Sequence, residues 1–239
     1  MVDLKHYILG CISNCQEVNM QDIKQYVIDY VEGRVSSKEF RLKVLTDRSI
    51  VMWLQSIVPT GEKMMIVEGF NEYGSAITKY VPYNIEYQIK NNWKCENGTT
   101  ENELNMIYEI FRLLNEAFPE LNLVVDETLG NKYDFILDAC PEYLLSVEIE
   151  QSGIIDSLMQ EIPSKLSKTK RIDVFKTKLK KMFYVEGRKY PRWIQESEWP
   201  LSKTGKPTKF LRQKSIGELT YYYFLDVDTD EEIEIIQSY

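Results

Sequence analysis

The sequence predicts an α+β protein, and three observations lead to this prediction. Apolar residues recur at three- and four-residue spacing through much of the first hundred residues, which indicates amphipathic helices. One long helical segment in the middle of the chain is followed by three short runs of β-forming residues. Further β-rich runs joined by short turns end the chain, and they predict an antiparallel meander.

Residues 1–98 form a mainly helical N-terminal region in this prediction. Apolar side chains at helical spacing predict a helix over 20–31, and Gly33 follows as a stop signal. Ser36 and Glu39 have the spacing of a capping box, which predicts the start of a second helix.

The rest of this region is less regular. Asp47 predicts a third helix start, and Pro59 ends the helical pattern. Residues 63–80 contain two glycines and favour loops or short strands, whereas 84–93 is expected to add a helix. We find no catalytic motif in this region.

A polar, turn-rich stretch, CENGTTENE, separates this region from an α+β C-terminal region at 99–239. Thr100 and Glu103 predict another capping box, and an amphipathic helix follows up to Pro119. The expected central unit is helix, three strands, helix. Its strands are predicted at LNLVVDE, KYDFILD and YLLSVEIE.

The last quarter of the chain begins with a lysine-rich helix predicted over 165–181. Beyond Gly187 the pattern changes, and a small antiparallel sheet of three or four strands is predicted at about 190–239. An acidic run at 226–237 begins like a calcium loop but lacks glycine at its sixth position and glutamate at its twelfth. We therefore predict a hairpin turn there.

The composition is that of a soluble globular protein. The 239 residues are 44% hydrophobic and 28% charged. No apolar run reaches the roughly 18 residues that a membrane helix needs, and the N-terminus lacks the pattern of a signal peptide. We expect a cytoplasmic protein without a membrane partner.

Four cysteines and one histidine restrict metal and nucleophilic chemistry. Cys11 and Cys15 lie four residues apart with His6 nearby, but a fourth zinc ligand at the usual spacing is missing. A single histidine also gives little support to Ser–His–Asp or Cys–His catalysis. We expect free, buried thiols, no metal and no cofactor.

Charge is distributed unevenly along the chain. Residues 99–164 carry 2 basic and 14 acidic side chains, a net charge of −12, whereas residues 165–214 carry 16 basic and 4 acidic ones, a net charge of +12. These segments either neutralise each other within the fold, or one of them presents a surface of a single sign to a partner. An acidic surface would attract basic partners and repel nucleic acid.

The central unit resembles the core of PD-(D/E)xK nucleases in the order of its predicted elements. Asp134 on the second strand, with Glu148 and Glu150 on the third, would then hold a metal that activates water. Carboxylates at alternate strand positions share one face, as metal binding requires. The chain departs from this family at Glu150, where the family has lysine. A metal-dependent nuclease is retained as the alternative function.

The C-terminal stretch 191–239 resembles a module of immunity-type proteins from bacterial polymorphic and contact-dependent toxin systems. The resemblance covers about a fifth of the chain. It is carried by Trp193-Ile194-Gln195, Glu198-Trp199-Pro200, Gly205-Lys206-Pro207, Phe210, Gln213 and the terminal TDEEIEIIQSY.

The aromatic residues of this module, Trp193, Trp199 and Phe210, either line a cleft or fill the corner of a small sheet. Large aromatic side chains between turn prolines suit a sheet that is too small to build a core from aliphatic residues, which favours a structural aromatic corner. Gln195 and Gln213 are expected to tie neighbouring backbone segments together.

The resemblance implies a protein that binds and does not catalyse. An immunity protein neutralises its cognate toxin domain by stoichiometric binding, which requires only a complementary surface. Many toxin domains are basic nucleases, so an acidic face suits this role. We expect the toxin-binding residues to be Glu101, Glu103, Glu109, Glu116, Glu120, Asp126, Glu127 and Asp134.

A third function, a nucleic-acid adaptor, would use the predicted lysine-rich helix. Its basic side chains would contact phosphates, and they are Lys165, Lys168, Arg171, Lys178 and Lys181. A solvated helix face explains the same pattern more simply, so nucleic acid is not the expected partner.

Overall fold

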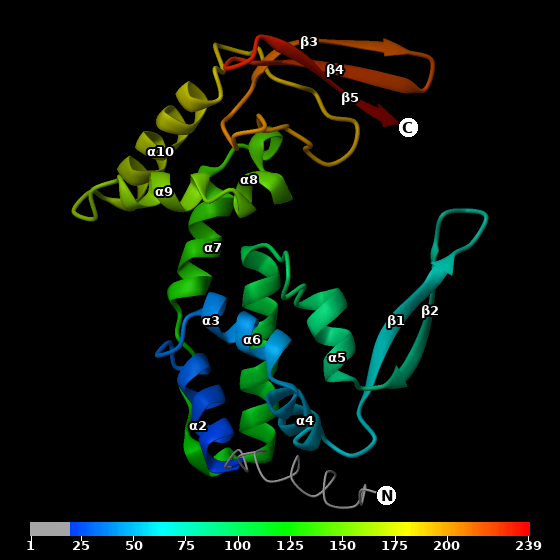
Figure 1. Ribbon diagram of the computed structural model, residues 1–239, viewed down its shortest axis with the longest axis vertical. Helices are drawn as coiled ribbons and strands as arrows, with labels where there is room; N and C mark the ends of the chain where they lie inside the picture. Colours follow the sequence, from blue (N-terminus) through cyan, green and yellow to red (C-terminus); the bar gives the residue numbers. More distant parts are fainter. Residues whose placement is uncertain (1–19) are drawn as a thin grey trace, which may run out of the picture. The chain divides into compact units, whose positions relative to one another are not determined.

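The computed structural model describes residues 20–239 and confirms the α+β class (Figure 1). The described chain falls into two compact units. Unit 1 comprises residues 20–96 and 102–128, and unit 2 comprises residues 97–101 and 129–239. The chain thus leaves unit 1 near the predicted boundary at residue 98, returns at Asn102 and leaves again after Thr128.

Unit 1 begins with three helices: α2 (Met20–Val31), α3 (Ser37–Thr46) and α4 (Arg48–Ser56). Local signals explain where they start, as predicted. The Ser36 hydroxyl accepts the N–H of Glu39 at 3.2 Å, and the Asp47 carboxylate accepts the N–H of Ser49 at 3.0 Å. Gly33, just past α2, has a φ of 77°, a conformation that favours glycine.

A two-stranded hairpin follows, formed by β1 (Lys63–Phe70) and β2 (Ala76–Pro82). The strands pair antiparallel, with an irregularity in register between Val67 and Gly69. The Asn71 side chain organises the turn, because its oxygen accepts the N–H groups of Tyr73 and Ser75. The glycines that left this segment ambiguous in the sequence therefore belong to a bulge and a turn.

Helical elements complete unit 1: α5 (Ile85–Tyr87), the π-helical turn η1 (Gln88–Asn92), α6 (Thr100–Ala117) and η2 (Pro119–Leu121). The predicted helices near 84–93 and before Pro119 are confirmed. Glu103, predicted to form a capping box with Thr100, instead pairs with Arg41. Fully buried side chains of the unit include Val27, Tyr30, Phe40, Leu54, Ile85, Trp93, Met106 and Leu114.

The three strands predicted in the central unit are wrong. The run LNLVVDE is irregular after η2, and Asn122 there has a left-handed backbone with φ of 50°. The run KYDFILD lies within a helix, and YLLSVEIE is divided between two short helices. These elements are α7 (Thr128–Ala139), η3 (Glu142–Leu144) and α8 (Val147–Gln151).

Burial explains this correction. Phe135, Ile136 and Ala139 are buried together, which is the spacing of one helix face. The hydroxyl of Ser146 accepts the N–H of Ile149 at 3.3 Å and caps α8. The alternating apolar and acidic residues at 147–150 therefore form one helical turn, in which only Ile149 is buried.

Unit 2 continues with α9 (Ile154–Gln160), α10 (Lys168–Met182) and a sheet of β3 (Lys209–Ile216), β4 (Leu219–Asp226) and β5 (Glu231–Ser238). The predicted lysine-rich helix and meander are confirmed, with β4 central and both pairings antiparallel. The acidic run forms the β4–β5 turn, as predicted, and Asp230 there has a φ of 59°.

Two cysteines lie in the described chain, and both are free and buried. Burial raises the pKa of Cys95 to about 11 and that of Cys140 to about 12, so neither is a ready nucleophile at neutral pH. His6, Cys11 and Cys15 lie outside the described residues. Within residues 20–239, no helix is both long and apolar enough to cross a membrane.

Candidate functional site

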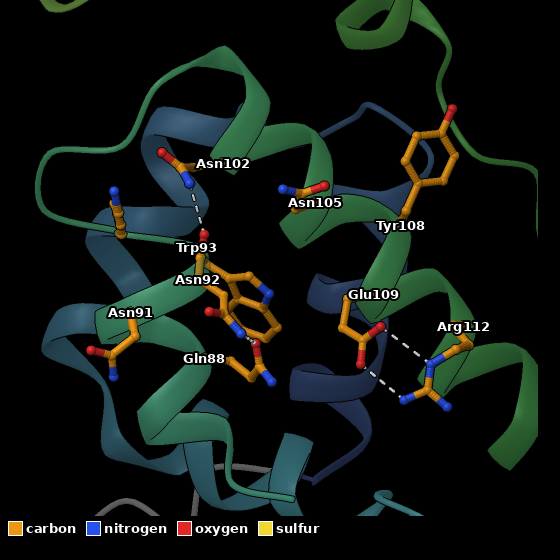
Figure 2. Close-up of a pocket in the computed structure, with 10 residues that line it drawn as sticks. Gln88, Asn91, Asn92, Trp93, Asn102, Asn105, Tyr108, Glu109 and Arg112 are labelled. Atoms are coloured by element: carbon orange, nitrogen blue, oxygen red, sulfur yellow. Dashed lines mark hydrogen bonds and ion pairs between the residues drawn. The ribbon is translucent and has the colours of Figure 1, made fainter. Parts of the chain in front are cut away.

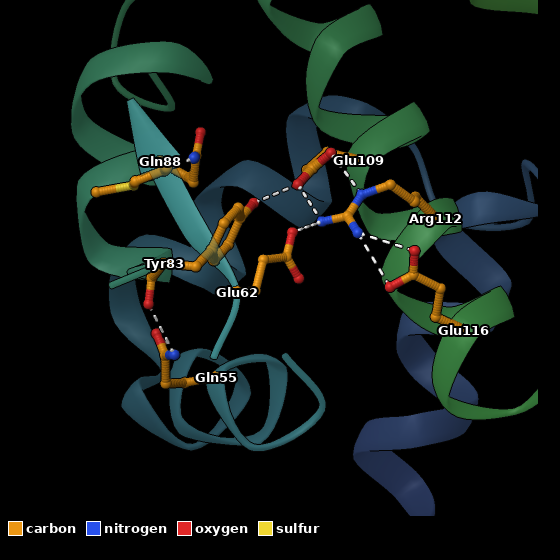
Figure 3. A network of polar contacts seen from close by, with 8 residues as sticks. Gln55, Glu62, Tyr83, Gln88, Glu109, Arg112 and Glu116 are labelled. Atoms are coloured by element: carbon orange, nitrogen blue, oxygen red, sulfur yellow. Dashed lines mark hydrogen bonds and ion pairs between the residues drawn. The ribbon is translucent and has the colours of Figure 1, made fainter. Parts of the chain in front are cut away.

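Several residues of the predicted acidic face are engaged inside unit 1. Figure 3 shows Arg112 of α6 surrounded by three carboxylates, those of Glu62, Glu109 and Glu116. Glu109 receives two hydrogen bonds from Arg112, at 2.9 and 3.2 Å, and one from the Tyr83 hydroxyl. These carboxylates are therefore partly neutralised by their own chain.

The environment of Glu109 keeps it ionised. Burial by itself would raise its pKa, but hydrogen bonds from Arg112 and Tyr83 and the charge of Arg112 outweigh burial and lower the pKa below its ordinary value. Tyr83 shows the opposite shift, because burial and the neighbouring Glu109 raise its pKa far above the usual range. The network holds the base of the β1–β2 hairpin against α6.

The other predicted toxin-binding residues have varied surroundings. Glu103 pairs with Arg41, and the Asp126 carboxylate accepts the N–H and hydroxyl of Thr128. Glu120 and Glu127 of unit 1 are exposed, as are Glu101 and Asp134 of unit 2. The eight residues are thus divided between both units, six in unit 1 and two in unit 2.

The carboxylates predicted for a nuclease do not lie on strands. Asp134 is exposed on α7, and Glu148 is exposed on α8. A side-chain oxygen of Glu150 accepts the N–H of Thr100 at 3.0 Å. In the described chain, no group of three or more histidine, cysteine, aspartate or glutamate residues is arranged to hold a metal. The strand geometry on which the nuclease interpretation depended is therefore wrong.

Unit 2 contains a different acidic feature, which we call the acidic pocket. It is an open cavity of about 700 Å³ between the η3–α8 segment and the loop after Tyr190. Its charged lining residues are Glu101, Glu142, Glu148, Glu150, Glu196, Glu198 and Arg192.

The charge of the acidic pocket is largely uncompensated. Its lining holds six carboxylates and one guanidinium. Within residues 20–239, none of these six glutamates forms an ion pair, whereas the acidic residues around Arg112 do. Like charges gathered on a concave wall produce a strong negative potential, which attracts cations and basic side chains.

Aromatic side chains form one wall of the acidic pocket. The rings of Tyr143 and Tyr190 stack with centroids 4.1 Å apart, and the Trp193 indole N–H donates to the Tyr143 carbonyl at 3.1 Å. Behind this wall, Trp193 packs on Tyr222 and Phe224 of the sheet. Burial raises the pKa of Tyr143, and its ring therefore stays neutral beside the glutamates.

Trp199, six residues further on, belongs to the core. It is fully buried, donates its indole N–H to the Thr208 carbonyl at 3.1 Å and lies edge-on to Phe183 and Phe224. Phe210 also contacts Phe224, with ring centroids 5.5 Å apart. Trp199 and Phe210 therefore fill the corner beneath the sheet, while Trp193 both joins that cluster and lines the pocket.

Side-chain amides hold the pocket loop on the sheet. The Gln237 carbonyl oxygen accepts the N–H groups of Ile194 and Gln195 at 3.2 Å, and its amide group donates to the Glu196 carbonyl at 2.8 Å. Gln195 donates to the Ser238 carbonyl, and Gln213 accepts the N–H of Arg192. These bonds position the backbone that carries Glu196 and Glu198.

No protein-family model, curated protein or solved structure matches this chain.

Sequence reasoning missed most of the acidic pocket. Glu142, Glu196, Glu198, Tyr190 and Gln237 were not singled out as binding residues, although Glu198 belongs to the recognised Glu-Trp-Pro motif. The useful signal was the pair of glutamates between Trp193 and Trp199, in an otherwise basic segment. The contribution of α8 was hidden, because its glutamates were assigned to a strand.

The basic residues proposed for a nucleic-acid adaptor are partly paired. On α10, Lys168 contacts Asp138 at 2.8 Å and Lys178 contacts Glu161 at 2.5 Å. The guanidinium of Arg171 lies 5.3 Å from the ring of Phe135. Lys165 and Lys181 are exposed. Residues of the acidic segment 99–164 and the basic segment 165–214 thus neutralise each other in part within unit 2. Mutual neutralisation was one of the two explanations that the charge pattern of the sequence offered.

Proposed function

We propose that this protein is a cytoplasmic binding protein that neutralises a toxin domain by stoichiometric binding. The acidic pocket of unit 2 is the proposed contact, and the partner is a basic protein domain. The observation that carries this proposal is the pocket lining, in which stacked aromatic side chains lie beside six glutamates that form no ion pair within residues 20–239.

The chemistry of the pocket suits arginine and lysine side chains. A guanidinium group forms charge-assisted hydrogen bonds with carboxylates and stacks on aromatic faces. Tyr143, Tyr190 and Trp193 offer such faces beside the glutamates. A basic toxin surface that binds phosphates would therefore find competing carboxylates here, and the long-range field would also accelerate association.

The proposed face differs from the one predicted along 101–134. Of the earlier residues, only Glu101 lines the acidic pocket, while Glu103, Glu109 and Glu116 have internal arginine partners. Exposed carboxylates without a competing intramolecular cation retain more of their attraction for a partner. This is the reason for moving the proposed contact to unit 2.

The first test is purification of the tagged protein from its native host at moderate salt, followed by identification of any protein that copurifies in one-to-one amount. A basic domain from the C-terminal end of a larger protein is expected. Recovery of the protein alone, or only with nucleic acid, would contradict the proposal.

The second test measures affinity for that domain after charge reversal. The double variant Glu196→Lys/Glu198→Lys should weaken binding at least about tenfold, because it reverses two exposed charges at the pocket. The wild-type association rate should also fall steeply as salt increases.

The matched control is Glu120→Lys/Glu127→Lys, which makes the same charge change at exposed positions of unit 1. It should leave affinity nearly unchanged. If the control weakens binding while the pocket variant does not, the partner uses the face first predicted from the sequence, and the acidic pocket is not the contact.

A further inference from the structure

Unit 1 contains a second cavity, of about 750 Å³, between the η1 turn and helix α6 (Figure 2). We call it the amide pocket, because half of its lining side chains are carboxamides. Its lining residues are Gln88, Asn91, Asn92, Trp93, Lys94, Asn102, Asn105, Tyr108, Glu109 and Arg112.

The π-helical turn builds one wall of the amide pocket. The N–H of Trp93 bonds to the carbonyl of Gln88 at 2.7 Å, five residues back, so this turn is wider than an α-helical one. The wider turn groups Gln88, Asn91 and Asn92 next to Trp93. Such π turns are uncommon and frequently occur at functional sites.

Internal hydrogen bonds orient these amides. Asn92 donates to the Gln88 side-chain oxygen at 2.6 Å, and Asn91 donates to the Tyr87 carbonyl at 3.0 Å. Asn102, on the opposite wall, donates to the Asn92 carbonyl at 2.8 Å. Each of these bonds uses one of the two N–H donors of Asn91 and Asn92 and fixes the orientation of the amide, whose oxygen is an acceptor.

Trp93 supplies the observation that points to a ligand. Trp93 is 1% exposed, and within the described chain no acceptor binds its indole N–H. The indole nitrogen is not one of the fully enclosed polar atoms that lack a partner, so it opens to the pocket, where an acceptor on a ligand can reach it. Figure 2 shows the indole at the centre of the pocket, with its nitrogen toward the side where Asn105 and Glu109 lie.

The remaining lining favours a neutral ligand. Arg112 is held by three carboxylates, and Glu109 is held by Arg112 and Tyr83, so neither charge is available for a strong new ion pair. Lys94, the third charged lining residue, is exposed and forms no ion pair within residues 20–239, so solvent screens its charge in part. Asn105 is exposed, and within residues 20–239 its side chain has no hydrogen-bond partner. Tyr108 is 47% exposed and offers a flat apolar ring.

We propose that the amide pocket binds a neutral, hydroxyl-rich ligand, namely a saccharide. A hydroxyl oxygen would accept the Trp93 indole N–H, and further hydroxyls would pair with Asn105 and with the side-chain oxygens of Asn91 and Asn92. The C–H face of a sugar ring would pack on Tyr108. A cavity of this volume is of the size that holds small-molecule ligands. This site is independent of the acidic pocket and of toxin binding.

The test uses the full-length protein labelled with ¹⁵N and a panel of maltotriose, cellotriose, chitotriose and galactobiose. The indole N–H signal of Trp93, assigned with Trp93→Phe, should shift on addition of at least one saccharide, and the dissociation constant follows from the titration. Acetylglycine methylamide, a mimic of peptide backbone, and inorganic phosphate are tested in the same way.

Asn105→Ala should weaken saccharide binding about three- to tenfold, as expected for the loss of one or two hydrogen bonds to a neutral ligand. Asn115→Ala is the matched control, since Asn115 is an exposed asparagine on the same helix outside the pocket lining, and it should bind normally. Both positions are exposed, so neither change should prevent folding.

Three results would overturn the proposal: no saccharide of the panel shifts the Trp93 signal, the peptide mimic or phosphate shifts it while the saccharides do not, or Asn105→Ala binds saccharide as the wild type does. Loss of toxin binding with retained saccharide binding, or the reverse, would separate this site from the acidic pocket.

Discussion

Arg112 joins three carboxylates that come from separate parts of unit 1. Glu62 precedes the β1–β2 hairpin, while Glu109 and Glu116 lie one turn to either side of Arg112 on α6. The side chain is 35% exposed, so solvent screens its interactions in part. Arg112 stabilises the fold because, without it, the partly buried carboxylates of Glu62 and Glu109 and the exposed carboxylate of Glu116 would lie together without a cation.

Replacing Arg112 with methionine should therefore reduce the free energy of unfolding of the protein by about 2 kcal/mol, a value already reduced for screening. Urea denaturation followed by fluorescence measures this change. The control Arg212→Met removes an exposed pair with Glu232 and should have a much smaller effect. Equal effects of the two substitutions would show that the Arg112 network adds no more than a surface ion pair.

At the scale of elements, the meander and the loop at 191–200 depend on each other. The loop has no regular secondary structure, and its backbone polar groups are satisfied by side chains of β3, β4 and β5. Gln237 alone makes three of these hydrogen bonds and is 2% exposed. A single strand residue thus helps to position Glu196 and Glu198, two of the six glutamates of the acidic pocket.

Gln237→Leu keeps the approximate size of the side chain but removes these bonds, leaving the N–H of Gln195 and the carbonyl of Glu196 without partners, whereas the N–H of Ile194 keeps its bond to the Tyr222 hydroxyl. We expect a loss of about 2–3 kcal/mol in the free energy of unfolding. Hydrogen exchange at the amide of residue 195 should become faster. Gln195→Leu, which removes one exposed bond to Ser238, is the control and should leave the amide of residue 195 protected.

At the scale of the whole molecule, most of the carboxylates with lowered pKa values among residues 20–239 lie in unit 1. A hydrogen bond from Gln25, followed by Arg34, lowers the pKa of Asp29, while Ser49 and then Lys43 lower that of Asp47. Glu109 is the third such group. In unit 2, the pKa of Asp228 is lowered, chiefly by Lys206.

A carboxyl group with a lowered pKa in the folded state stabilises the protein above its unfolded-state pKa, about 4, and this contribution is lost as pH falls through the folded-state value. We therefore expect acid to destabilise unit 1 before unit 2. The indole signals of Trp53 and Trp93 report on unit 1, and those of Trp193 and Trp199 report on unit 2. Simultaneous loss of all four native signals below pH 4 would contradict this expectation.

Elements with strong local signals were predicted correctly from the sequence. Ser36 and Asp47 cap helices by hydrogen bonds to residues two or three positions away. A few neighbouring residues in the sequence are therefore enough to predict where these helices begin. The C-terminal strands were also predicted correctly, because β-formers and turn residues alternate there over short distances. The α+β class follows from these local signals.

The central strands were predicted wrongly because β-forming residues also occur in helices when packing favours them. Phe135 and Ile136 are residue types with high β-propensity, yet here they lie in a helix and pack on Phe175 and its neighbours. The run 147–150 fits both the two-residue period of a strand and the 3.6-residue period of a helix. Four residues are too few for the sequence pattern to distinguish a strand from a helix.

The sequence by itself determined the class of the fold, the helix caps at Ser36 and Asp47, the β4–β5 turn, and the concentration of acidic residues in one part of the chain. Only the tertiary structure decided which of those acids remain available. Glu103 meets Arg41, 62 residues away along the chain, whereas Glu148 and Glu198, fifty residues apart in sequence, line one pocket and form no ion pair within residues 20–239. Such pairings depend on neighbours that are distant along the chain, and local sequence patterns do not contain that information.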